Sequence, residues 1–334
     1  MKKRFLSVIT LFAMTLFAGC GSSAPESAPS SETISATVSV PEESKDTVSV
    51  PESERFEVNP PFFKVENKET GAVVYMLGSM HVGKAGATYP DKMYKALDEC
   101  ETLAVEVDIL ALESDIAAAT EATMIMLCEQ GKTVRDYLGD DYDFIMGKFR
   151  EKGLYSKLYE SYIPALWSSM WASAAAAECG YDVNAGTDRL LLAYAKEHGK
   201  TVEEIESAKE QYQMEADNSP AMATYLLKAT VELSAEETRE QFDMLYDSWK
   251  SGNIAALKGL AEEEDEELPT ELKSDYEKYY DAMYTHRQEK MASYVKSKLK
   301  SGGKTFVVVG AMHYAAPPSI IDILTENGYT VETL

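Results

Sequence analysis

Two short segments of this 334-residue chain place a glycine and a histidine at the same spacing, each directly after an apolar run. They are Gly78-Ser-Met-His81 and Gly310-Ala-Met-His313. Glycine at a strand end lets the backbone turn sharply, and histidine is the commonest metal ligand and a general base near neutral pH. The chain has only 4 histidines, so two of them in matching motifs predict one shared functional site. For either motif taken singly, a purely structural turn is the alternative.

Charged candidates for the same site lie elsewhere in the chain. Glu106 and Glu206 each end a short strand-like run, and Arg287 follows His286 in a long helical pattern. A buried carboxylate needs a metal ion or a cation as its partner. Glu106 is therefore predicted to bind a metal or to take a proton from water, and Arg287 to steady negative charge. A solvated strand end and an ordinary ion pair are the alternatives. His198 and His286 are expected on helix surfaces.

The elements that must position these residues are strands followed by helices. Strands are predicted at 62–66, 72–77, 102–108, 201–206, 304–309 and 329–333. Helices are predicted at 91–100, 110–129, 141–151, 156–179, 187–198, 209–216, 220–230, 235–250, 274–299 and 317–326. If the strands before the two histidine motifs are parallel, both imidazoles stand at the carboxyl edge of the sheet, where open α/β sheets bind ligands. The predicted fold is an α/β domain with a small mixed sheet wrapped by many helices.

The two histidine motifs also lead into similar series of elements. Each precedes a loop with proline, then a helix, then a strand carrying Val-Glu, at Val105-Glu106 and Val331-Glu332. This pattern predicts a loose internal duplication.

The first residues predict export and a lipid anchor. Three basic residues, Lys2 to Arg4, precede an apolar stretch that is too short to span a bilayer, and Gly19-Cys20 follows it. We expect residues 1–19 to be a signal peptide and Cys20 to be lipid-modified; an ordinary signal peptide cut nearby is the alternative. Residues 20–56 are rich in Ser, Glu, Pro and Thr, which favours a disordered stalk. The folded domain is then 57–334, held on the extracytoplasmic face of the cell membrane.

The composition narrows the partners. Lys and Arg number 32 against 56 Asp and Glu, so the net charge is −24. Nucleic acid is not expected as a partner, because a phosphate-binding surface needs the opposite sign. An anionic bilayer would also repel this domain, so the lipid must hold it. The widely spaced Cys100, Cys128 and Cys179 suggest free thiols, with a single disulfide as the alternative.

Taken together, these motifs resemble the TraB/GumN family, which includes relatives of the Tiki membrane metalloproteases. The resemblance is carried by Leu77-Gly-Ser-Met-His81, Val105-Glu-Val-Asp108, Gly186-Thr-Asp188, Ile205-Glu-Ser207 with Gln211, Arg287 with Met291, Phe306 to His313, and Gly328-Tyr329. It places the family's paired histidines on His81 and His313, its acid on Glu106 and its helix arginine on Arg287. The chain departs from the pattern at Gln288, where asparagine is usual, and at Tyr314-Ala-Ala-Pro317, where an apolar residue and a glycine usually follow the second histidine.

The resemblance implies a metal-dependent peptidase that acts on peptides or proteins at the membrane surface. His81, His313 and Glu106 would hold the divalent metal, which is manganese or cobalt in Tiki relatives; zinc also suits two histidines and a carboxylate. Arg287 and Glu206 would complete the catalytic site. Three alternatives stay open. The first is metal-free hydrolysis as in erythromycin-esterase-like proteins, with histidine as the base. The second is a lipoprotein that binds a metal, a peptide or haem without turnover, and the third is a surface protein whose motifs are structural relics.

Overall fold

A six-stranded mixed sheet forms the centre of the computed structural model, which describes residues 51–334. Its order is β6-β5-β7-β3-β2-β8. The strands are β2 (Phe62–Asn67), β3 (Ala72–Ser79), β5 (Thr102–Val105), β6 (Thr201–Glu204), β7 (Lys304–Gly310) and β8 (Val331–Thr333). β6, β5, β7 and β3 run parallel, whereas β2 forms an antiparallel hairpin with β3 and pairs with β8 antiparallel. The predicted α/β class with a small mixed sheet is confirmed.

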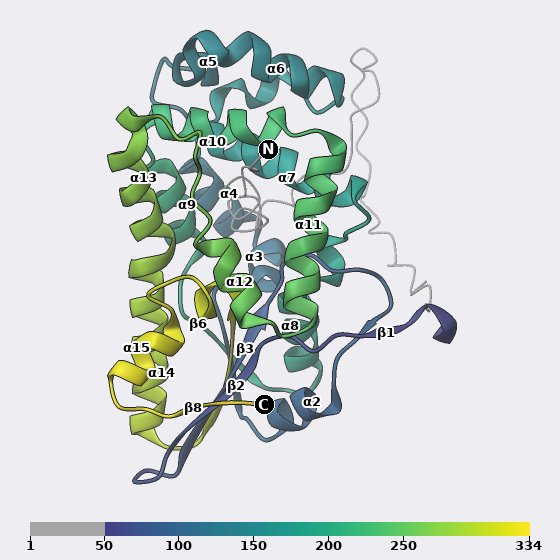
Figure 1. Cartoon of the computed structure of the whole chain (residues 1–334), viewed down its shortest axis with the longest axis vertical. Coiled ribbons are helices and arrows are strands. Elements are labelled where there is room, and N and C mark those ends of the chain that lie inside the picture. Colours follow the sequence, from purple (N-terminus) through teal and green to yellow (C-terminus); the bar gives the residue numbers. More distant parts are fainter. Residues whose placement is uncertain (1–50) are drawn as a thin grey trace, which may run out of the picture.

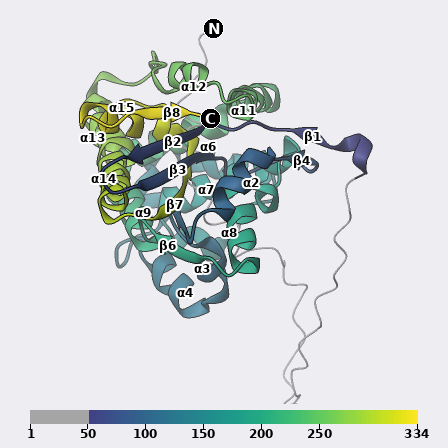
Figure 2. The same ribbon diagram turned by 90° about the horizontal axis from the view of Figure 1, so that it is seen from below.

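Helices cover both faces of the sheet, which explains why its central strands are apolar on both sides. α14 (His286–Ser301) and α15 (Ile320–Glu326) pack on one face, against Met76 and Val307. α2 (Asp91–Asp98) and α8 (Thr187–Glu197) pack on the other, against Leu77 and Val308. Figure 2 shows the two helix pairs on opposite sides of the strands. Alternate residues of β3 and β7 therefore belong to two different cores.

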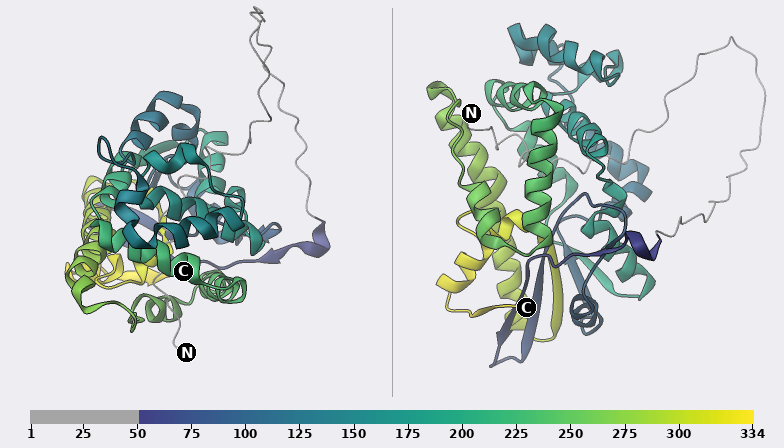
Figure 3. Two further views of the ribbon diagram at one scale, coloured as in Figure 1. Left: turned by 90° about the horizontal axis from the view of Figure 1, so that it is seen from above. Right: turned by 45° about the vertical axis from the view of Figure 1, so that its right-hand side comes forward.

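A helical cap lies over the carboxyl ends of the parallel strands (Figures 1 and 3). Its helices are α5 (Val134–Leu138), α6 (Tyr142–Glu151), α7 (Pro164–Glu178), α10 (Pro220–Glu232), α11 (Ala235–Lys250), α12 (Ile254–Ala261) and α13 (Lys273–Tyr280). Its core contains Trp167, Trp171 and Trp249, together with Met80 and Ala311 from the segments that follow β3 and β7. The indole Nε1 of Trp249 donates to the carbonyl of Gly78 at 2.9 Å, which attaches α11 to the end of β3.

Several predicted boundaries are corrected by the structure. The strand expected at 102–108 ends at Val105, so Glu106 follows the strand, and Asp108 caps the next helix by accepting from the Ala111 amide. The helix expected at 110–129 is two helices, α3 (Ile109–Ser114) and α4 (Ile116–Met124), because Asp115 caps the second. α5 and α12 were not predicted.

The last long helical pattern, 274–299, is interrupted by a π-helical turn, η7 (Asp281–Thr285), between α13 and α14. Single π-turns inside helices occur frequently at functional sites, because the extra residue re-aims the side chains of that turn. Here the turn lies just before Arg287 and includes Met283 and Tyr284, which are both buried.

The predicted signal peptide, the lipidation of Cys20 and most of the stalk lie outside the described residues. Between residues 51 and 334, no helix has the length and apolar character needed to cross a membrane. The thiols of Cys100, Cys128 and Cys179 are free, as expected for the domain.

Candidate active site

All four parallel strands deliver a candidate residue to the same edge of the sheet. His81 follows β3, Glu106 follows β5, Glu206 follows β6, and His313 lies in a 3-10 turn, η8 (Ala311–Tyr314), after β7. His81, Glu106 and His313 line one pocket together with Arg287. Both histidines were predicted to lie at this edge if the strands before them are parallel. β3 and β7 are indeed parallel neighbours in the sheet.

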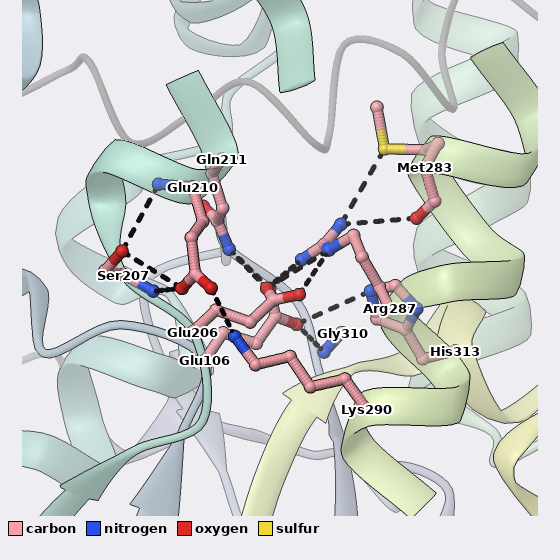
Figure 4. Close-up of polar contacts among 10 residues, drawn as sticks. All are labelled: Glu106, Glu206, Ser207, Glu210, Gln211, Met283, Arg287, Lys290, Gly310 and His313. Atoms are coloured by element: carbon pink, nitrogen blue, oxygen red, sulfur yellow. Dashed lines mark hydrogen bonds and ion pairs between the residues drawn. The ribbon is translucent and has the colours of Figure 1, made fainter. Parts of the chain in front are cut away.

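Arg287 lies at the centre of a buried ion cluster (Figure 4). Its Nη2 donates to Glu106 Oε2 at 2.6 Å and to Glu206 Oε2 at 2.7 Å, and its Nε donates to both oxygens of Glu206. The Gln211 amide from α9 (Ala208–Ala216) donates to both carboxylates as well. One guanidinium and one amide thus hold two buried carboxylates side by side.

Glu106 is kept ionised despite its burial. Its side chain is only 9 % exposed, and burial alone would raise its pKa. The positive charge of Arg287 opposes this, and so do the nearby histidines and the Gly310 amide, which donates to Glu106 Oε1 at 2.6 Å; the net result is a lowered pKa. A glycine suits the last position of β7, because a Cβ there would lie 3.3 Å from Glu106 Oε1.

Asp188 orients His81, and the sequence reasoning did not assign it a role. Its Oδ2 lies 2.8 Å from Nδ1 of His81, so the other ring nitrogen of this imidazole is left for the pocket. Burial acts to lower the pKa of His81, but the charge and hydrogen bond of Asp188, with the charge of Glu106, outweigh it and raise the pKa to about 9. His81 is therefore an imidazolium at neutral pH. The sequence feature that could have identified Asp188 is an acidic residue among the apolar residues of a helical pattern. It lies near Leu191 and Leu192, which are buried in the structure.

Close backbone packing sets the distance between His81 and Asp188. A Cβ on Gly186 would lie 2.3 Å from the carbonyl oxygen of His81, and one on Gly83 would lie 2.1 Å from that of Ala185. Gly83 and Asp182 also exchange backbone hydrogen bonds in both directions. The two loops can approach this closely only because glycine occupies both positions.

Replacing Gly186 by alanine is expected to push these loops apart and to lower the free energy of unfolding by roughly 1–3 kcal/mol, the usual cost of overpacking. The measurement is urea denaturation of the full chain. Gly147→Ala in α6 is the control, since nothing lies within 4 Å of its Cβ position and alanine favours helix there. Equal stability of the two variants would contradict the close-packing argument.

His313 is a neutral base in this site. It is 5 % exposed, and its ring lies 5.9 Å from the ring of Tyr284 between centroids. Burial lowers its pKa and the charge of Arg287 adds to this, which brings the pKa to about 4 although Glu106 opposes both. Nε2 lies 3.8 Å from Glu106 Oε1, and the buried Nδ1 has no hydrogen-bond partner. At neutral pH, His81 is therefore protonated and His313 is neutral.

A divalent metal ion would need free donor atoms on the expected ligands His81, His313 and Glu106. The unpaired Nδ1 of His313 and the hydrogen bond that His81 Nδ1 donates to Asp188 are features that suit ligand histidines. However, both oxygens of Glu106 are already occupied by Gly310, Arg287 and Gln211. Nowhere in residues 51–334 do three His, Cys, Asp or Glu side chains converge closely enough to hold a metal ion. As arranged, these side chains do not fit a bound metal, and the metal expectation stays a prediction.

The two departures from the family pattern contact each other. Gln288 is fully buried, and its Nε2 donates to the carbonyl of Ala316 at 3.0 Å. Ala316 belongs to the atypical segment after His313. The side-chain amide of Gln288 on α14 therefore reaches the atypical loop. This hydrogen bond connects the helix that carries Arg287 to the loop that follows His313.

Other candidates lie away from the pocket or were missed. His198 and His286 are exposed, as expected; His286 begins α14, whereas His198 directly follows the end of α8. Glu332, the counterpart of Glu106 in the loose duplication, is exposed on β8, so the correspondence between the two halves does not extend to this acid. Tyr284 lines the pocket and was not predicted, because its position depends on the π-turn. The buried Glu215 was also missed; burial raises its pKa to about 7.

Comparison with known proteins decides the family. Residues 61–333 match the model of the TraB/PrgY/gumN family, which is most of the chain. The chain belongs to the TraB/PrgY/gumN family. No curated protein and no solved structure matched it. Within this TraB/PrgY/gumN domain, the pocket at the carboxyl edge of the sheet contains both histidine motifs, the acid and the arginine that suggested the family from sequence.

Proposed function

We propose that this protein is a hydrolase that cleaves peptides or proteins at the membrane surface, with His81 and His313 as its acid–base pair. The observation that carries the proposal is the convergence of both motif histidines on one pocket, one held by a carboxylate and the other buried and unpaired at Nδ1. Pairs of titratable groups whose environments push their pKa values apart are the usual arrangement for acid–base catalysis.

In the proposed reaction, neutral His313 takes a proton from a water molecule that attacks the carbonyl carbon of the substrate. Glu106 lies 3.8 Å from Nε2 of His313 and stabilises the imidazolium that forms there. His81, protonated and held by Asp188, gives its proton to the leaving amine or alcohol as the bond breaks. Arg287 acts as a positioning residue, because its hydrogen bonds to Glu106 and Glu206 hold Glu106 in place.

The peptide substrate and the location rest on the family resemblance and on the amino-terminal sequence. We propose that residues 1–19 direct export, that Cys20 carries the lipid and that the segment 20–56 tethers the domain to the outer face of the cell membrane. Such a tether confines hydrolysis to substrates at the same surface, because it raises their effective concentration around the site. Metabolic labelling with a fatty acid tests the anchor, and Cys20→Ser should abolish the label.

The decisive test is turnover by the purified full chain. Peptide mixtures are incubated with the protein and the new termini are identified by mass spectrometry, with and without a chelator and with manganese, cobalt or zinc added back. Water activation by His313 predicts cleavage that survives chelation. Loss of cleavage on chelation and recovery with one metal would instead support the metal-dependent peptidase. Binding of a metal, peptide or haem without any product would favour the non-catalytic alternative.

The rate of hydrolysis is expected to follow a bell-shaped pH profile. Activity requires neutral His313 and protonated His81, so kcat/KM should fall below a pH of about 4 and above a pH of about 9. Asp188→Asn removes the charge that raises the pKa of His81 while burial persists, so the upper limb should move to lower pH. An upper limb unchanged in this variant would contradict the assignment of His81 as the acid.

The same pKa shift has a consequence for stability. The pKa of His81 is raised from 6.5 to about 9, so its stabilising contribution is complete below pH 6.5 and is lost as the pH rises through about 9. The loss of stability between these values should therefore be smaller in Asp188→Asn than in the parent chain.

A further inference from the structure

The pocket that contains the candidate catalytic residues has a second, apolar part. Its empty space, including the mouth that opens to solvent, is about 570 Å³. The five charged or titratable side chains of the lining, which are His81, Glu106, Tyr284, Arg287 and His313, lie among a larger apolar lining. That lining comes from α11, α12, η7, η8 and the segment after β3, through Met80, Leu245, Trp249, Leu257, Met283 and Met312.

The apolar part of the pocket offers few polar partners to a ligand. The single N–H of the Trp249 indole is already bonded to the carbonyl of Gly78, so only the ring remains for contact. Glu106 and Arg287 are bonded to each other. A charged or strongly polar ligand group would lose its water there without gaining a hydrogen bond, whereas an apolar group loses nothing and is removed from water.

Most of the apolar side chains that line this part of the pocket are packed in the cap, but the methionines among them can change conformation. Leu257 and Met283 are 0 % and 1 % exposed, and Trp249 is 1 % exposed, so these side chains are held by the packed cap behind them. Met80 and Met312 complete the wall, and unbranched methionine side chains adjust to ligands of different shape. Such a surface favours large apolar groups as a class over one particular side chain.

We propose that this part of the pocket is a specificity subsite for a bulky apolar side chain, such as leucine, methionine or phenylalanine, next to the bond that is presented to His81 and His313. The proposal rests on the proposed hydrolase function and names its substrate class: peptides with a large apolar residue beside the scissile bond. Acidic residues at that position are disfavoured, because the apolar side chains of the subsite give a carboxylate no hydrogen bond and the Arg287 guanidinium is already bonded to Glu106 and Glu206.

The experiment measures binding without turnover. The full chain carrying His313→Gln is titrated by calorimetry with blocked tripeptides Ala-X-Ala, in which X is leucine, methionine, phenylalanine, glycine or aspartate. The three bulky apolar peptides are expected to bind roughly tenfold to a hundredfold more tightly than the glycine peptide. The aspartate peptide should bind no better than glycine. Equal affinities across the series, or no binding at all, would overturn the subsite.

A second pair of variants locates the binding. Leu257→Phe fills the subsite and should abolish the preference for bulky residues, whereas Leu257→Ala enlarges it and should keep the preference. Leu158→Phe is the matched control, because Leu158 is 80 % exposed and lies outside the pocket. Thermal unfolding of each variant shows whether it is folded, and a preference that persists in folded Leu257→Phe would overturn the assignment.

The experiments distinguish failure of the hydrolase function from failure of the apolar subsite. Selective binding by His313→Gln with no cleavage by the parent chain would leave the subsite standing and overturn the hydrolase. Cleavage by the parent chain that is indifferent to X would support the hydrolase and overturn the subsite.

Discussion

Replacing either motif histidine by alanine is expected to lower hydrolysis by roughly a hundredfold to ten-thousandfold, the usual range for losing a general acid or base. His313→Ala removes the group that takes the proton from water, and His81→Ala removes the group that protonates the leaving atom. Both effects should appear in kcat/KM for peptides, and the double variant should be little worse than either single one, since the two histidines act in one reaction.

The chain contains its own controls for this experiment. His198→Ala and His286→Ala remove the other two histidines, which are both exposed and do not line the pocket. These variants should retain full activity. If all four variants behave alike, or if His81→Ala and His313→Ala are folded and fully active on a cleaved peptide, the shared site is not the place of catalysis. Circular dichroism before the assay distinguishes loss of chemistry from loss of fold.

Replacing Arg287 by methionine is expected to cause the largest loss of stability. The guanidinium is 11 % exposed and is the cation bonded to both Glu106 and Glu206, which are 9 % and 5 % exposed. Removing one partner of a buried ion pair leaves uncompensated charge and typically costs about 3–5 kcal/mol. Urea denaturation at neutral pH measures the difference. Arg189→Met, which breaks the more exposed pair with Glu113, should cost about 0–1 kcal/mol.

A second substitution tests whether unpaired charge is the cause. Glu206→Gln removes one of the two carboxylates, so the double variant Arg287→Met with Glu206→Gln should regain part of the stability that Arg287→Met loses. The loss caused by Arg287→Met should also shrink at acidic pH, because Arg287 lowers the pKa of Glu106 and the unpaired Glu106 carboxylate becomes protonated more readily. An additive double variant with no pH dependence would show that the arginine contributes through packing alone.

Local sequence was sufficient to locate the strand ends that carry the site. The apolar runs before Gly78 and Gly310 predicted two buried strands, and both form, as parallel neighbours in one sheet. An apolar strand followed by glycine and histidine is a local signal, because the apolar run and the turn after it lie within about ten residues of each other. Two predicted boundaries were wrong. Asp115 caps a second helix inside the predicted helix 110–129, and the strand predicted at 102–108 ends at Val105, before Glu106.

The sequence by itself thus determined the α/β class, the family pattern and the five residues His81, Glu106, Glu206, Arg287 and His313 as candidates. Only the tertiary structure decided their partners. Asp188 meets His81 across 107 positions of the chain, and Arg287 meets Glu206 across 81. Such contacts depend on how loops and helices pack above the sheet, which no local pattern encodes. The opposite pKa shifts of the two histidines arise in the same way, because burial and neighbouring charge exist only once the chain is folded.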